Sequence, residues 1–136
     1  MTSLFLDTSA FVALVDRKDR NHGAAKQILK TAARRRRPLV TSTYVLDETV
    51  TLLRFKLGHD AAVEFGERLT TTTWCRTVEV DPDLRAMAWQ IFVQYQDQMF
   101  SFTDCTSFAL MRAMGLTEAF SFDRTDFGAA GFIAID

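Results

Sequence analysis

Four acidic residues, spread over nearly the whole chain, carry the clearest chemistry in this sequence. Asp7, Asp104 and Asp123 lie at or beside the ends of apolar runs, and Glu48 lies inside a helical stretch. A solvated loop carboxylate would not be expected at such positions. If the fold brings the four side chains together, they form a site for a hard cation, and such sites serve phosphate chemistry.

Glu48 is the acid that is hardest to explain without a ligand. On a helix its neighbours are Val45 and Leu52, so its own face is partly apolar, whereas Asp47 faces polar residues and looks solvated. A carboxylate on an inward face is costly unless something pairs with it, and the inward faces offer no obvious Lys or Arg partner. A bound divalent cation would supply the missing positive charge.

The three aspartates also have ordinary structural explanations. Asp7 fits a strand-end or helix-cap residue, Asp104 fits a first-turn helix stabiliser, and Asp123 fits a turn residue. Spacing alone is a weak signal here, because the residues are far apart in the sequence. Only their convergence in the fold would make them a site.

The segments that must position these acids alternate between short apolar strands and amphipathic helices. Strands are predicted at residues 4–6, 39–41, 74–80, 119–122 and 132–135. Helices are predicted up to Val15, from Asp19 or Asn21 to the arginine run 34–37, and over residues 44–57, 61–69, 82–95 and 103–114.

Helix caps and the order of the elements predict the architecture. Thr8 or Ser9 is expected to cap the first helix, and Ser42 or Thr43 the third. Strands that alternate with helices indicate an α/β fold with a parallel sheet covered on both faces. Ligands bind at the carboxyl ends of the strands in such a sheet, where we expect Asp7 and Asp123 to project.

Composition limits the class of protein. The 136 residues suit one compact domain, which we place over residues 1–136. Sixteen basic and seventeen acidic residues leave a net charge of -1, which argues against nucleic-acid binding by bulk charge but leaves room for a local basic groove. Two cysteines cannot make a disulfide framework, and no apolar run approaches the roughly 18 residues of a membrane span. We expect a soluble cytoplasmic protein with no membrane partner.

Four short segments together resemble the PIN-domain family, and within it the VapC-type toxins of bacterial toxin–antitoxin pairs. They are Leu-Asp-Thr-Ser-Ala-Phe at residues 6–11, Thr-Tyr-Val-Leu-Asp-Glu-Thr at 43–49, Ser-Phe-Thr-Asp-Cys at 101–105 and Phe-Asp-Arg-Thr-Asp-Phe at 122–127. Each segment alone is a weak match, but all four in this order on an alternating chain are specific. The resemblance covers essentially the whole sequence.

The resemblance implies a three-layer α/β/α domain with a central, mostly parallel sheet. It also implies an endoribonuclease that depends on Mg²⁺ or Mn²⁺ and hydrolyses RNA phosphodiester bonds with a metal-activated water, an inhibitory antitoxin, and a homodimer. By position, the family's catalytic and metal-site acids correspond to Asp7, Glu48, Asp104 and Asp123. Asp126 is a further metal-site candidate that would bind through water or order its loop.

Candidate substrate contacts and the remaining polar groups each have two interpretations. Thr8 or Ser9 corresponds to a polar residue near the metal, and Arg112 would contact substrate or antitoxin, or else form a surface salt bridge. The run 34–37 is favoured as a solvated helix end over a contact with RNA phosphates. No histidine-based nuclease arrangement competes, since His22 and His59 are expected to be cap or surface residues.

An aromatic stripe and two rival functions complete the predictions. Trp89, Phe92 and Tyr95 follow one another at helical spacing, for which the core is the default and a dimer interface the alternative.

A catalytically inactive PIN-like module that binds protein or RNA is disfavoured because all four acidic positions are occupied. A phosphohydrolase with Asp7 as nucleophile is disfavoured because that chemistry usually needs a second acid two residues on, where this chain has Ser9.

Overall fold

The computed structural model describes residues 1–136, and its centre is a five-stranded sheet in which every neighbouring pair of strands is parallel. The strands are β1 (Leu4–Leu6), β2 (Leu39–Ser42), β3 (Cys75–Val78), β4 (Glu118–Phe120) and β5 (Ile133–Ile135). Their spatial order is β3-β2-β1-β4-β5. The chain therefore builds one half of the sheet outward from β1 and then returns to β1 to build the other half.

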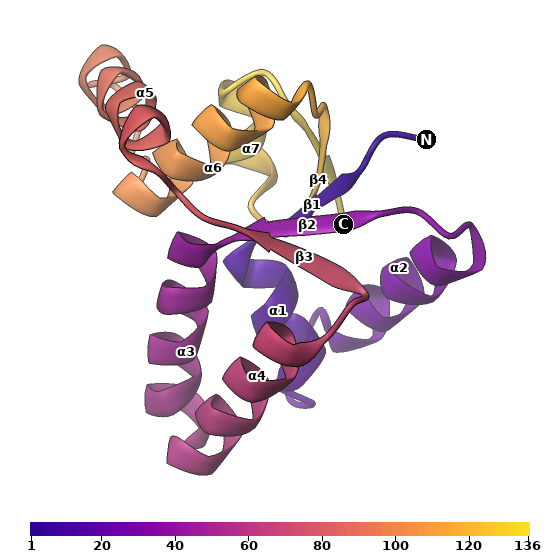
Figure 1. The fold of residues 1–136 in the computed structure, drawn as a ribbon. Coiled ribbons are helices and arrows are strands. Elements are labelled where there is room, and N and C mark those ends of the chain that lie inside the picture. Colours follow the sequence, from indigo (N-terminus) through magenta and orange to yellow (C-terminus); the bar gives the residue numbers. More distant parts are fainter.

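Seven helices connect the strands. They are α1 (Thr8–Val15), α2 (His22–Arg34), α3 (Thr43–Leu57), α4 (His59–Thr71), α5 (Pro82–Gln94), α6 (Phe102–Met114) and α7 (Arg124–Ala129). The first four lie on one face of the sheet and the last three on the other (Figure 1). This arrangement confirms the expected three-layer α/β/α fold. No helix is both long and apolar enough to cross a membrane.

The core forms on both faces of β1. Phe5 and Leu6 are fully buried because helices cover the sheet on each side. On the upper face in Figure 1, Phe108 of α6 packs edge-to-face on Phe127 of α7, with ring centroids 5.1 Å apart. This contact joins α6 to α7 within the core, so the acids at the starts of these helices are held by buried side chains.

Two elements differ from the sequence-based expectation for local reasons. Helix α4 extends to Thr71, two residues beyond the predicted end at residue 69. The hydroxyls of Thr70 and Thr71 donate to the carbonyls of Gly66 and Glu67, at 2.8 and 2.7 Å, which lets both threonines remain helical. Helix α7 was not predicted at all, because its six residues are too few to show a helical period.

Other differences concern the ends of elements. Neither Thr8 nor Ser9 caps α1, because the N-cap position is occupied by Asp7. Strands β3 and β4 are shorter than predicted, and β4 ends at Phe120 rather than at residue 122. The chain therefore turns through Ser121 before it reaches Asp123, which caps α7 instead of directly following a strand.

Candidate metal centre

Asp7, Glu48, Asp104 and Asp123 line one hollow of about 500 Å³. Asp7 follows β1, and Asp123 lies three residues after the end of β4. These two strands are neighbours in the sheet, and the chain reverses its direction of sheet building between them. The hollow therefore lies at the topological switch point of the sheet, where ligands bind in open α/β folds.

Three of the carboxylates come close enough to share one cation. Oxygen atoms of Asp104, Asp123 and Asp126 lie within 4.8 Å of one another. Opposite oxygens around Mg²⁺ are separated by about 4.2 Å, twice the metal–oxygen distance. The structure thus brings Asp126 beside two of the four predicted acids, although it does not line the hollow itself.

Asp7 is held in place by two serine hydroxyls. Its side chain is buried, and its Oδ2 atom accepts hydrogen bonds from Ser9 at 3.1 Å and from Ser121 at 2.9 Å. The Ser9 hydroxyl in turn accepts a bond from the backbone N–H of Phe122 at 2.9 Å. These bonds connect the end of β1 with the end of β4 and leave the Asp7 Oδ1 atom without a side-chain donor.

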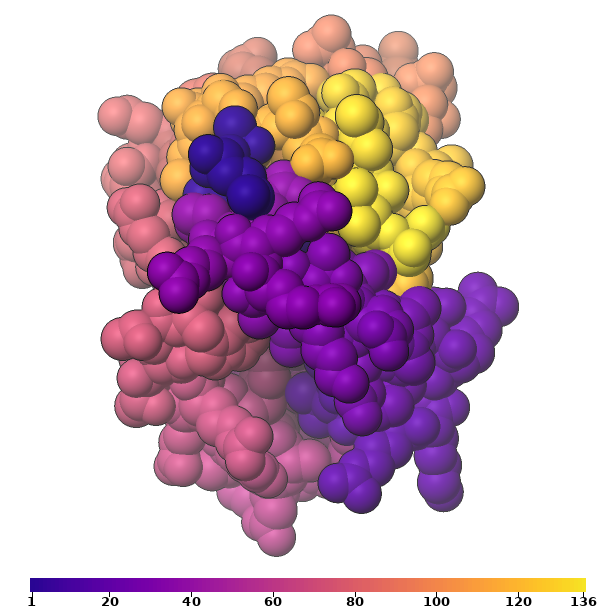
Figure 2. All heavy atoms as spheres, turned by 90° about the vertical axis from the view of Figure 1, so that its right-hand side faces the viewer, coloured from indigo at the N-terminus to yellow at the C-terminus, as the bar shows by residue number.

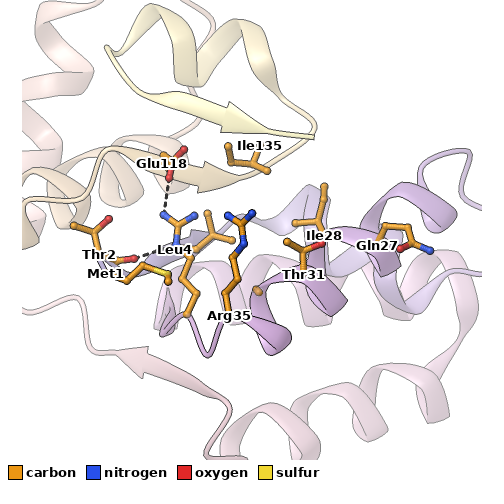
Figure 3. A pocket seen from close by; sticks show the side chains of 11 residues that line it. Met1, Thr2, Leu4, Gln27, Ile28, Thr31, Arg35, Glu118 and Ile135 are labelled. Carbon is orange, nitrogen blue, oxygen red and sulfur yellow. Dashed lines mark hydrogen bonds and ion pairs between the residues drawn. The ribbon is translucent and has the colours of Figure 1, made fainter.

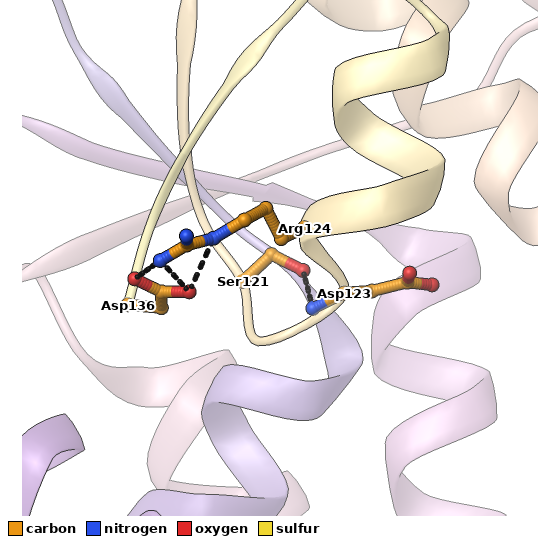
Figure 4. Close-up of polar contacts among 4 residues, drawn as sticks. All are labelled: Ser121, Asp123, Arg124 and Asp136. Atoms are coloured by element: carbon orange, nitrogen blue, oxygen red, sulfur yellow. Dashed lines mark hydrogen bonds and ion pairs between the residues drawn. The ribbon is translucent and has the colours of Figure 1, made fainter.

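Ser121 also positions Asp123. Its hydroxyl accepts the backbone N–H of Asp123 at 3.0 Å, and the Asp123 side chain accepts the backbone N–H of Asp126 at 3.2 Å. The neighbouring Arg124 forms a bidentate pair with Asp136 beyond the end of β5, with contacts of 2.7 to 3.0 Å (Figure 4). The start of α7 is thereby attached both to the floor of the hollow and to the edge of the sheet.

Asp104 is oriented by a capping box at the start of α6. The Ser101 hydroxyl accepts the Asp104 backbone N–H, and Asp104 Oδ2 accepts the Ser101 backbone N–H, each at 3.0 Å. The other carboxylate oxygen of Asp104 is left for a ligand. The structural and functional explanations of this aspartate are therefore compatible, because one oxygen caps the helix and the other lies near the acids.

No cationic side chain neutralises these acids. The four ion pairs of the structure join other residues, and none includes one of the five carboxylates. Burial raises the pKa of Asp7 to about 6, and the charge of Asp104 adds to the shift. Burial also raises the pKa of Asp104, with further contributions from Asp123 and Glu48.

The pKa of Asp126 is also raised, in part by the neighbouring carboxylates. Partial burial, a hydrogen bond with Asp123 and the charges of Asp123 and Asp104 raise its pKa to about 6. A bound cation would relieve the repulsion among these carboxylates, which have no basic partner. The all-oxygen set fits Mg²⁺ or Mn²⁺ rather than a soft metal.

Of the three predicted substrate contacts, two lie at the hollow and one does not. Thr8 and Ser9 line the hollow, and the buried Thr8 Oγ1 atom has no hydrogen-bond partner. Arg112 is exposed in the last turn of α6, about 12 Å along the helix axis from Asp104. The structure does not bring Arg112 to the hollow.

Ser121 is the residue that the sequence analysis missed. It is fully buried and contacts Asp7 and the backbone of Asp123, so it is the link between two acids. A serine two residues before an acid, directly after an apolar strand, was the available signal.

Cys105 follows Asp104 in α6 and is buried in the core. Burial and the charge of Asp104 raise the pKa of its thiol to about 11. Burial raises the pKa of Cys75, the other cysteine, to about 12.

Acids gathered at the carboxyl edge of a parallel sheet, without cationic partners, form a candidate divalent-metal centre of the kind that serves phosphate chemistry. The sequence matches the PIN domain over residues 4–133. It is 41% identical to the 23S rRNA-specific endonuclease VapC20 of Mycobacterium tuberculosis, over 97% of each chain. The chain belongs to the PIN-domain family, and within it to the VapC-type toxins.

Solved structures agree with this assignment. The crystal structure of M. tuberculosis VapC20, a Sarcin-Ricin loop cleaving toxin, matches with a TM-score of 0.89 and 40% identity over 98% of each chain. The structure of DNA-bound VapBC from Salmonella typhimurium has a TM-score of 0.70 at 17% identity, covering 100% of this chain and 98% of that one. The second likeness is one of fold alone.

The raised pKa of Asp7 predicts how stability depends on pH. Between its ordinary value of 3.8 and about 6, the folded state holds the proton more tightly than the unfolded state does. In metal-free protein, rising pH across this window should therefore cost on the order of 2–3 kcal/mol, a loss that Asp7→Asn lacks. Thermal unfolding of both proteins from about pH 4 to about pH 7 measures the difference. If the stability of both proteins changed with pH in the same way, the raised pKa of Asp7 would be contradicted.

The two bonds of Ser121 predict a positioning role. Ser121→Ala should lower the free energy of unfolding by about 1–3 kcal/mol, because a buried carboxylate and a backbone N–H lose a partner. Its affinity for Mg²⁺ should fall roughly tenfold to a hundredfold. The matched control is Ser107→Ala, which removes a buried hydroxyl that has no partner and should be neutral or stabilising. Urea unfolding and calorimetry test both variants, and equal effects would reject the role.

Proposed function

We propose that this protein is a metal-dependent endoribonuclease that acts as the toxin of a toxin–antitoxin pair. The observation that carries the proposal is the convergence of Asp104, Asp123 and Asp126 within 4.8 Å, with Asp7 and Glu48 beside them. The 41% identity to an rRNA-specific endonuclease supports RNA as the substrate.

Mg²⁺ or Mn²⁺ would be held by Asp7, Glu48, Asp104 and Asp123, with Asp126 as a further ligand or as a partner through water. When bound, the metal would supply activation of a water for attack on phosphorus and stabilisation of negative charge on the phosphate oxygens. The chain's own groups hold the acids in place for this chemistry. Ser9 and Ser121 fix Asp7, and the capping box fixes Asp104.

The substrate we propose is a structured ribosomal RNA. The relative with 41% identity is named as specific for 23S rRNA, and its structure is described as that of a toxin cleaving the Sarcin-Ricin loop. Thr8 and Ser9, which line the hollow, would contact the RNA near the cut. Arg112 is a weaker candidate for such a contact, because it lies about 12 Å along α6 from Asp104.

The partner we propose is a cognate antitoxin. An apolar groove of about 470 Å³ between α1, α2 and α4 offers it a docking surface. The groove includes Phe11, Phe65 and Trp74, with Arg17 and Arg68 among its lining residues. If the antitoxin binds there, adding it in purified form should suppress RNA cleavage.

A homodimer through α5 is the second partnership that we propose. Trp89 and Phe92 are 54% and 42% exposed, so the expectation that they belong to the core is wrong. Their rings stack with centroids 5.7 Å apart, and Phe102 packs against both. An exposed aromatic cluster of this kind is typical of a protein–protein interface.

Cleavage of RNA tests the proposed activity. Purified protein supplied with Mg²⁺ or Mn²⁺ should cut ribosomal RNA, and a chelator should stop it. Asp104→Asn should lower the rate about 100-fold or more, because a metal ligand contributes several kcal/mol to the transition state. The control is Asp47→Asn, an exposed acid beside Glu48, which should cleave like the wild type. If none of the proteins cuts RNA, the inactive binding module becomes the better hypothesis.

Light scattering tests the dimer. Trp89→Lys should shift the protein from dimer to monomer, because a charge would be buried at the interface. Phe55→Lys changes a residue that is 82% exposed on α3 and should leave the dimer intact. A wild-type protein that is monomeric at all accessible concentrations would remove the proposed interface.

A further inference from the structure

Positive charge in this chain is concentrated in one segment. Nine of the sixteen Lys and Arg residues lie between Arg17 and Arg37, where Asp19 is the only acid. The rest of the chain holds seven basic and sixteen acidic residues. The net charge of -1 therefore conceals a strong separation between a basic segment and an acidic remainder.

Helix α2 arranges part of this charge in a row. Lys26, Lys30 and Arg34 are exposed and four residues apart, while Ala25 and Ala32 on the opposite side are buried in the core. None of the three forms an ion pair, and α2 contains no acidic residue. We call Lys26, Lys30 and Arg34 the basic ridge. In Figure 2 the purple spheres of α2 and of the turn after it cross the face that is turned to the viewer.

Helix stability does not explain the basic ridge. Like charges four residues apart on a helix repel one another, so each neighbouring pair is destabilising. The helix dipole favours Arg34 in the last turn but gives no support to Lys26 in the first half. The row of unpaired cations therefore does not stabilise its own helix, and it is available to an external anion.

The basic ridge begins beside the acidic hollow. Asn21, the N-cap of α2, and Asp19 both line that hollow. Lys26 lies about 7 Å further along the helix axis, and Arg34 about 12 Å beyond Lys26. The ridge therefore leads from the predicted cleavage site toward the opposite edge of the sheet.

At its far end the ridge meets a second hollow, of about 480 Å³, between α2 and the sheet. Arg35 extends into it beside Thr31, and Gln27 lines the hollow further along α2 (Figure 3). The adjacent Arg37 is neutralised by Glu118 at 2.7 Å, whereas Arg35 has no ion pair. Arg35 thus adds one more free cation to the end of the row.

An acidic centre that acts on RNA needs basic surface elsewhere. The carboxylates repel a phosphate backbone until a cation is bound, and even then the surrounding chain has an excess of acids. Contacts between Lys or Arg and phosphates supply affinity without reading sequence, and they position the nucleic acid. The basic ridge is well placed to provide such contacts.

We propose that the basic ridge and Arg35 bind the sugar–phosphate backbone of the RNA that flanks the cut. This inference rests on the proposed function, which supplies RNA as the ligand. It replaces the interpretation of the arginine run as a solvated helix end. In this arrangement α2 guides the RNA chain, while the acids at its N-terminal end act on one phosphodiester bond.

Salt-dependent RNA binding tests the proposal. The probe is a fluorescently labelled RNA hairpin, whose binding is measured by anisotropy over a range of KCl concentrations, without divalent cation so that nothing is cut. Lys30→Gln/Arg34→Gln should weaken binding about tenfold and lower the slope of log affinity against log salt by about 2. Glutamine has a helix propensity close to that of lysine and arginine, so α2 should remain folded. Circular dichroism confirms this.

The matched control is Arg76→Gln/Arg85→Gln, which removes two exposed cations on β3 and α5. It should leave affinity and salt slope close to wild type. Equal losses in both double variants would attribute binding to net charge and overturn the proposal. Unchanged RNA binding in the ridge variant, with weaker binding of the antitoxin, would also overturn it by making α2 a protein interface. A wild type that binds the hairpin through the ridge but cleaves no RNA would refute the proposed activity and leave the ridge as an RNA-binding surface.

Discussion

Repulsion between carboxylates is the constraint on which the rest of this structure depends. Asp7, Glu48, Asp104 and Asp123 line one hollow together with Asp19, Asp126 lies alongside, and no Lys, Arg or His forms an ion pair with any of them. Left free, such side chains would turn toward water and separate. Burial of Asp7 and the raised pKa values of Asp7, Asp104 and Asp126 show that the fold holds them together against this tendency.

Several parts of the fold hold these acids in place. The switch point of the sheet places the ends of β1 and β4 side by side, and the hydroxyls of Ser9 and Ser121 join the two ends. The capping box fixes the start of α6, and the packing of Phe108 on Phe127 joins α6 to α7 in the core. The proposed metal would bind acids that are already in place, so little ordering would be needed when it binds.

Much of this arrangement is predictable from the sequence, for identifiable reasons. The four main acids stand out because they lie beside apolar runs, and alternating strands and helices define the sheet edge where they meet. Ser121 is not predictable in the same way, because a serine after a strand resembles any turn residue until its hydrogen bonds are seen. Helix α7 is too short to show a period. Helical spacing is the same for a core stripe and an exposed one, so Trp89 and Phe92 were assigned to the core, yet are exposed.

The position of the charged residues was also only partly predictable from the sequence. The arginine run is visible in the sequence, but its relation to the acids depends on where α2 begins and in which direction it runs. Because Asn21 lines the hollow, α2 starts beside the candidate metal centre and runs away from it. Acid and base are then separated along one molecule, with the acids suited to a metal and the bases to a phosphate backbone.

Cys105 has a consequence for how such a centre can be controlled. Its thiol stands next in sequence to Asp104, yet it is buried and has a pKa of about 11, so almost none of it is thiolate at neutral pH. The thiolate is the form that reacts with peroxides, disulfides and alkylating agents, and Cys75 is still less acidic, with a pKa of about 12. Both cysteines are therefore protected from oxidants by burial and by their low thiolate fraction. Control of this protein through oxidation of its thiols is disfavoured, even though one of them is next in sequence to Asp104.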